Sequence, residues 1–122
     1  MKVASQVSED KLRGGFYSPA SLVRLCLDRA LEFLGDADHL AVVEPSAGNG
    51  AFIDGLMRHQ LGLRVQHLLA IEVVKSEAAA CRERADGAIF GCQVIEGSAL
   101  SWAASPKRGT YDLAIGNPPF VR

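Results

Sequence analysis

The chain has 122 residues, of which 48% are hydrophobic and 22% are charged. This composition predicts one globular domain, or part of one, with a buried core. The net charge is -1, so the chain lacks the excess of basic residues that is typical of a stand-alone nucleic-acid-binding protein. Because the apolar runs are too short to cross a bilayer and the polar N-terminus lacks a signal-peptide core, we expect a cytoplasmic protein with no membrane partner.

The cysteines and histidines lack the spacing of metal ligands. Cys26, Cys81 and Cys92 are odd in number and include no Cys-x-x-Cys pair, so neither a disulfide framework nor a zinc site is expected. The three histidines, at positions 39, 59 and 67, also lack mutual ligand spacing. The sequence therefore predicts no metal site.

Regular structure is expected after a polar, flexible N-terminal arm of residues 1–15, so that the domain proper occupies residues 16–122. Ser18 is expected to cap a helix with Pro19 at its first position, because Ser favours the N-cap and Pro suits the first turn. Apolar residues then recur at helical spacing up to Gly35, which is expected to end this helix.

Short apolar runs and helical segments alternate along the rest of the chain. Strands are expected at residues 40–43, 68–71, 93–96 and 111–115, helices from residue 51 to near Gly62 and over residues 76–86, and a loop over residues 97–109. This alternation predicts βαβ units with right-handed crossovers. The expected fold is therefore α/β, with a parallel sheet covered by helices on both faces.

Polar and turn-forming residues collect where the predicted strands end. The strand ends carry Glu44-Pro45, Glu72, Glu96-Gly97-Ser98 and Asn117-Pro118-Pro119-Phe120. The carboxyl ends of parallel strands share one edge of the sheet, where such folds bind their ligands. We expect the functional site at this edge.

The segment from Asn117 to Phe120 has the equipment to hold a planar amine. Its side-chain and backbone carbonyl oxygens can accept hydrogen bonds beside an aromatic face. The segment therefore predicts chemistry on an amino group.

The turn Gly48-Asn49-Gly50 predicts a close approach of the backbone to a ligand, because glycine tolerates positive φ and lacks Cβ. The third glycine of a dinucleotide fingerprint would be residue 53, which is Ile53, so a cofactor without phosphates is favoured. Glu72, at the end of the next strand, is placed to accept both hydroxyls of a ribose. Alternatively, the glycine turn only connects a strand to a helix, and Glu72 is only a solvated carboxylate at the end of a strand.

Taken in order, these segments resemble the N-terminal part of a class I S-adenosylmethionine-dependent methyltransferase domain. The resemblance is to the group that methylates the exocyclic amine of adenine in DNA in restriction-modification systems, and it covers roughly residues 15–120. It implies the N-terminal half of a Rossmann-like parallel sheet, without the later strands and the target-recognition region. The isolated chain is accordingly expected to be inactive alone and to self-associate through its incomplete sheet.

The resemblance also implies residue roles. Residues implied to bind S-adenosylmethionine, or its product S-adenosylhomocysteine, are Phe16, Tyr17, Ser18, Pro19, Glu44, Pro45, Ser46, Ala47, Gly48, Gly50, Glu72, Val73, Ser98, Ala99 and Asn117. Residues implied to be catalytic are Asn117, Pro118, Pro119 and Phe120. Phe16 and Tyr17 can instead clamp the first helix, and both roles are compatible.

One residue departs from the family pattern. Ser98 stands where the family usually has an aspartate that bonds the amino group of the cofactor's adenine. A hydroxyl can accept that bond without the charge assistance of a carboxylate. The alternative is that Ser98 caps a loop.

The implied substrate is adenine flipped out of double-stranded DNA, with Phe120 stacked on the extruded base. For Phe120 the alternative is packing against the rest of the domain. Rival acceptors are RNA bases and protein glutamine, which similar enzymes methylate with the same motif, and a further rival is a non-catalytic cofactor-binding module.

Overall fold

The computed structural model describes residues 18–104 and 110–118, so the predicted arm lies outside the described residues. The helices are α2 (Ala20–Leu34), α3 (Ala51–Met57), the 3-10 helix η1 (Gln60–Arg64), α4 (Lys75–Asp86) and α5 (Ala99–Ala103). The strands are β1 (Leu40–Glu44), β2 (Val65–Glu72), β3 (Gly91–Glu96) and β4 (Leu113–Ala114). Among these helices none is long and apolar enough to cross a membrane.

The four strands form one parallel sheet in the order β3-β2-β1-β4. The chain moves outward from β1 through β2 to β3 and then returns to the other side of β1. This reversal creates a switch point between the central strand β1 and β4, where open α/β sheets bind ligands. The predicted parallel α/β architecture is confirmed.

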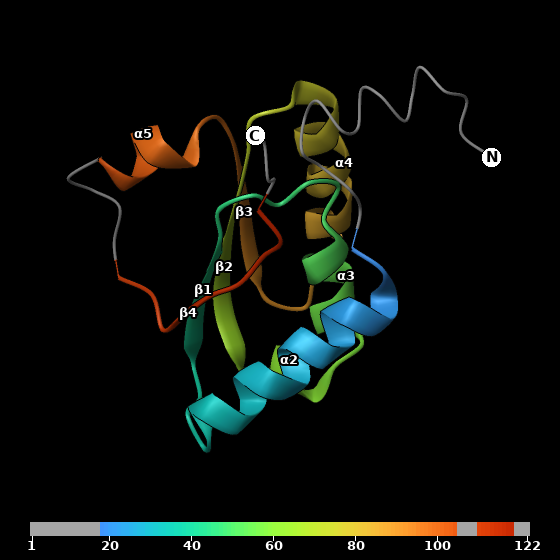
Figure 1. Cartoon of the computed structure of the whole chain (residues 1–122), viewed down its shortest axis with the longest axis vertical. Helices are drawn as coiled ribbons and strands as arrows, with labels where there is room; N and C mark the ends of the chain where they lie inside the picture. The colour runs from blue at the N-terminus through green and yellow to red at the C-terminus, as the bar shows by residue number, and fades with distance from the viewer. Residues whose placement is uncertain (1–17, 105–109, 119–122) are drawn as a thin grey trace.

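Helices cover both faces of the sheet, as predicted, but unequally (Figure 1). Helices α2, α3 and α4 pack on one face, around a core that includes Leu27, Leu56 and Leu68. The other face has a smaller cluster built on Val43, Leu69 and Ile71, and α5 contributes Trp102 to it. The main core therefore lies between the sheet and the three longer helices.

The start of α2 differs from the prediction. Its N-cap is Pro19, whose carbonyl oxygen accepts hydrogen bonds from the amides of Leu22 and Val23, both at 3.0 Å. The predicted cap at Ser18 was wrong, because the N-cap position is taken by Pro19 and no described side chain caps the helix. The end of the helix is as predicted, with Gly35 at φ +56°. The Ser18 hydroxyl is left available for another contact.

Other boundaries were predicted less well. The segment expected to be a loop over residues 97–109 contains α5, and the helix expected to reach Gly62 ends at Met57 and is followed by η1. The last strand is two residues long, although the Asp112 and Ile115 amides also donate to β1 carbonyls at 2.8 and 3.0 Å. These hydrogen bonds hold the segment before Asn117 against β1.

Candidate active site

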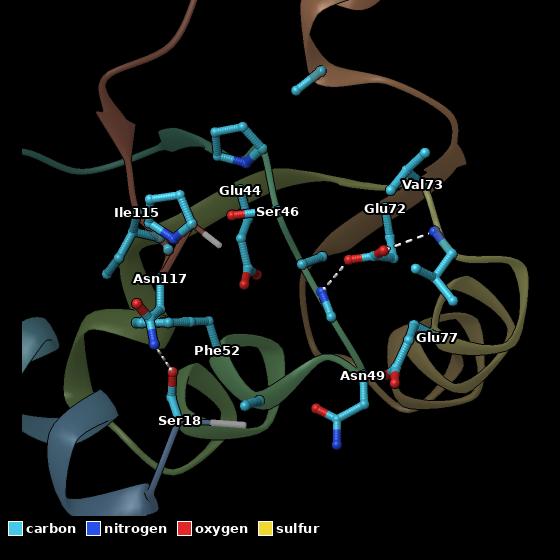
Figure 2. A pocket seen from close by; sticks show the side chains of 18 of the residues that line it. Ser18, Glu44, Ser46, Asn49, Phe52, Glu72, Val73, Glu77, Ile115 and Asn117 are labelled. Carbon is cyan, nitrogen blue, oxygen red and sulfur yellow. Dashed lines mark hydrogen bonds between the residues drawn. The ribbon is translucent and has the colours of Figure 1, made fainter. Parts of the chain in front are cut away.

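A cavity of about 710 Å³ lies at the carboxyl edge of the sheet (Figure 2). Its lining includes most of the described residues that the sequence assigned to the site: Ser18, Glu44, Pro45, Ser46, Ala47, Gly48, Glu72, Val73, Ser98, Ala99, Asn117 and Pro118. Phe16, Tyr17, Pro119 and Phe120 lie outside the described residues. Of the remaining two predictions, Pro19 and Gly50, neither lines this cavity.

The sequence missed several residues that line the cavity. They are Ala51, Phe52, Val74, Glu77, Leu100, Ala114, Ile115 and Gly116, whereas Asn49 and Gly97 also line the cavity and lie in segments that the sequence had placed at this edge. Phe52 lies in the first turn of α3 and Glu77 in the first turn of α4. The signal that could have found them is their position, because the first turn of a helix that follows a parallel strand lies at the ligand-binding edge.

The loop after β1 uses its two glycines differently. Gly48 has φ +57°, and a Cβ built on it would meet no atom within 4 Å. Gly50 has φ +95°, and a Cβ there would lie 2.9 Å from Arg84 Cδ and 3.4 Å from Cys81 Cα. Gly48 therefore opens onto the cavity, whereas Gly50 allows the loop to pack against α4.

Glu72 is almost buried and is fixed by two backbone amides. Its Oε1 accepts from the Gly48 amide and its Oε2 from the Val74 amide, each at 2.8 Å. A carboxylate oxygen can accept a second hydrogen bond, so both oxygens keep capacity for a ligand. The structure thus presents a rigid acceptor at the end of β2, and the ribose-binding role of Glu72 stays a prediction.

Glu44 is the most deeply buried charged residue of the cavity, at 1% exposure. Among the residues that the structure describes, none forms a hydrogen bond with its Oε2. Burial and, to a smaller extent, the neighbouring Glu72 carboxylate raise the pKa of Glu44 well above its ordinary value of 4.5. A buried, unpartnered carboxylate is costly unless a donor or cation meets it. The cavity therefore suits a ligand with a positively charged, hydrogen-bonding group.

Asn117 follows a backbone segment that lies against Glu44, and its side chain is bound by Ser18. A Cβ built on Gly116 would lie 3.5 Å from Glu44 Cγ and 3.6 Å from Ser46 Oγ, so this backbone lies against the end of β1. The Asn117 Nδ2 donates to Ser18 Oγ at 3.2 Å. Figure 2 shows the amide nitrogen turned toward Ser18 and the amide oxygen turned away from it. The oxygen remains available as an acceptor.

Ser98 caps α5, because its Oγ accepts from the Leu100 amide at 3.2 Å. Ser98 therefore caps a helix, and not the loop that the sequence predicted here. The hydroxyl proton and a second lone pair remain for a ligand, so a contact with the cofactor's adenine stays a prediction.

Within the part of the chain that the structure describes, no group of three or more His, Cys, Asp or Glu side chains could hold a metal ion. His59 is instead structural: its Nε2 lies 2.7 Å from Asp28 Oδ1, and its Nδ1 accepts from the Leu61 amide at 3.0 Å.

Sequence comparison finds relatives among methyltransferases, although no protein-family model matches the chain. Over 109 residues the chain is 30% identical to the type II methyltransferase M.HincII of Haemophilus influenzae, which covers 89% of this chain and 17% of the relative. Over 80 residues it is 36% identical to the 4-amino-L-phenylalanine/4-methylamino-L-phenylalanine methyltransferase of Streptomyces pristinaespiralis, covering 66% of this chain and 25% of the relative. The chain thus spans a small part of the length of both relatives.

Structure comparison finds the same fold in solved methyltransferases. A putative class I S-adenosylmethionine-dependent methyltransferase from Listeria monocytogenes matches with a TM-score of 0.71 at 15% identity, over 94% of this chain and 37% of that protein. A type I restriction-modification methyltransferase subunit from Streptococcus thermophilus matches with a TM-score of 0.72 at 18% identity, over 86% and 23%. The fold is therefore that of the class I S-adenosylmethionine-dependent methyltransferases, and the sequence similarity confirms the predicted resemblance to restriction-modification methyltransferases.

Proposed function

We propose that this chain is the N-terminal part of an enzyme that transfers a methyl group from S-adenosylmethionine to the exocyclic amino group of adenine in DNA, in a restriction-modification system. The observation that carries the proposal is the shared cavity, which is lined both by Asn117, with its acceptor side chain, and by the buried Glu44. The type II and type I methyltransferases found by comparison support the DNA substrate.

The residues of the cavity fit S-adenosylmethionine as the cofactor. The buried Glu44 carboxylate, whose Oε2 has no partner among the described residues, suits the ammonium group of its methionine part, and Glu72 has acceptor capacity for ribose hydroxyls. Gly48 leaves space where a side chain would enter the cavity. When bound, this cofactor supplies an electrophilic methyl group.

Asn117 and Pro118 would prepare the amine. The exocyclic nitrogen of adenine is a poor nucleophile, because its lone pair is delocalised into the ring. Acceptors at Asn117 Oδ1 and at the Pro118 carbonyl would bind its two hydrogens and stabilise the positive charge that develops on nitrogen during transfer. The amine loses a proton only after transfer, so no general base is needed beforehand.

The base must leave the duplex to reach this cavity, and we propose that Phe120 stacks on it. Later parts of the protein would supply the rest of the base pocket and the DNA contacts. β4 pairs only with β1 among the described strands, so the isolated chain is expected to self-associate through the free edge of β4.

A second candidate acceptor is a small aromatic amine. It is favoured by the similarity to a methyltransferase named for 4-amino-L-phenylalanine, whose amino group is attached to an aromatic ring. The same pair of acceptors would serve either amine, so the two candidates differ in what surrounds the acceptor ring. The other functions to be tested are methylation of RNA bases, methylation of a protein glutamine, and cofactor binding without catalysis.

The test is transfer of tritiated methyl groups by the complete protein to DNA, RNA, protein and 4-amino-L-phenylalanine. We expect labelling of adenine in DNA, and loss of labelling in Asn117→Ala with S-adenosylhomocysteine affinity preserved. Gln66→Ala, an exposed amide near the start of β2, is the control and is expected to stay active. Unchanged turnover in Asn117→Ala would remove its catalytic role, and labelling of the small amine alone would replace the DNA substrate.

A further inference from the structure

Ser18 has a hydroxyl that its helix does not use. A serine directly before Pro19 is expected to cap the helix, yet α2 has no side-chain cap. The Ser18 oxygen instead accepts from Asn117 Nδ2 at 3.2 Å, across 99 positions of sequence. This contact links the start of α2 to the segment that follows β4 (Figure 2).

The two ends of the Asn117 amide have opposite hydrogen-bonding properties. Its oxygen can accept from an amine, whereas its nitrogen is a donor and would repel the hydrogens of that amine. Catalysis under the proposed function therefore needs the oxygen, and not the nitrogen, turned toward the substrate. Whatever holds the nitrogen in place decides whether the acceptor is presented.

Ser18 is suited to hold the nitrogen, because both partners are carried by ordered segments. Ser18 is bonded to Pro19, the N-cap of α2, and this helix is anchored in the core by Val23 and Leu27. Asn117 follows Gly116, which lies against Glu44 and Ser46. Ser18 also lines the cavity, so its hydroxyl can accept from Asn117 and still donate its own proton to a bound ligand.

We propose that Ser18 is a positioning residue, which keeps Asn117 Nδ2 turned away from the substrate amine so that Oδ1 faces it. This proposal rests on the proposed function, because only an amine substrate requires that orientation. It assigns to the hydroxyl a role separate from any contact with the cofactor.

The contact can be measured without methyl transfer. The chain has two asparagines, Asn49 and Asn117. When the 122-residue chain is labelled with ¹⁵N-asparagine, its NMR spectrum therefore contains two pairs of side-chain amide signals, one pair for each asparagine. We expect Ser18→Ala to move the chemical shifts of the Asn117 pair toward those of a free amide, and Ser18→Thr to leave these shifts unchanged. Asn49 is the internal control, and its unchanged signal would show that the fold is retained. An Asn117 signal that is the same in Ser18→Ala and the wild type would overturn the proposal.

Kinetics of the complete protein supply the second readout. We expect Ser18→Ala to lower kcat by about 10–100-fold, as for a misplaced catalytic group, with a smaller change in the KM for DNA, and Ser18→Thr to restore most of the rate. A change in KM alone, or failure of Thr to restore kcat, would overturn the positioning role. A wild-type protein that methylates no amine would reject the proposed function instead, whereas the NMR result would still report on the contact.

Discussion

The Glu72 carboxylate accepts a hydrogen bond from the Gly48 amide at 2.8 Å, which ties the end of β2 to the loop after β1. The other oxygen of the same carboxylate binds the Val74 amide, also at 2.8 Å. One side chain therefore orders two loops of the cavity before any ligand enters. A ligand that uses the remaining lone pairs of Glu72 would meet an acceptor that is already positioned.

We expect Glu72→Ala to lower both stability and cofactor affinity. Two backbone amides would lose their acceptor, which costs about 1–3 kcal/mol of unfolding free energy, and ribose binding would weaken by a similar amount. Urea denaturation measures the first effect and calorimetry with S-adenosylhomocysteine the second.

The matched control for Glu72 is Glu96→Ala. Glu96 is the register partner of Glu72 on β3, but its carboxylate is exposed and forms a distant ion pair with Arg82, at 4.0 Å. We expect a stability change within about 0.5 kcal/mol for this surface variant. Equal affinity in Glu72→Ala and the wild type would remove the ribose-binding role.

Glu44 makes stability depend on pH. Because its folded pKa is raised, the native chain holds a proton that the unfolded chain releases above about 4.5. The stabilisation is complete below the unfolded pKa and is lost as pH rises through the folded pKa. We expect Glu44→Gln to remove this part of the pH dependence in urea titrations, whereas Glu96→Gln keeps it. Parallel profiles for Glu44→Gln and the wild type would contradict the prediction.

Glu44 also links ligand binding to protons. In the free cavity the raised pKa favours the neutral acid, whereas a bound ammonium favours the carboxylate. Binding of S-adenosylhomocysteine at a pH between the ordinary pKa of 4.5 and the raised pKa of Glu44 is therefore expected to release protons. Calorimetry in buffers of different ionisation enthalpy counts them. Release that persists in Glu44→Gln would assign the protons to another group.

The order of strands and helices could be predicted because each buried strand is a continuous apolar run. Leu68 to Ile71 marked β2, but its first residues mix Val65 with polar Gln66, so the true start was missed. Helix α5 was missed because it is five residues long and buries none of them. Although Trp102 packs on the smaller cluster, so short a helix has too few positions for a helical period to be detected.

The position of the site at one edge of the sheet could also be predicted, because the topology of a parallel sheet brings Glu44, Glu72 and Asn117 to the same edge. The contact between Ser18 and Asn117 could not, since it depends on how the start of α2 lies against the segment after β4. Contacts between distant segments follow from packing, and no local sequence pattern reports them.

The last prediction concerns three glycines that have different surroundings. Gly35, Gly48 and Gly50 all have positive φ, so each change to Ala introduces backbone strain of about 1–3 kcal/mol. At Gly50 the new Cβ would also collide with Arg84 and with the Cys81 backbone, so Gly50→Ala is expected to be the least stable of the three. Gly35 and Gly48 have open space beside them, and their variants should unfold at similar urea concentrations.

Only Gly48→Ala adds a methyl group beside the cavity, so it alone should weaken S-adenosylhomocysteine binding beyond its loss of stability. Equal binding by the Gly35 and Gly48 variants would show that the cofactor does not approach this loop.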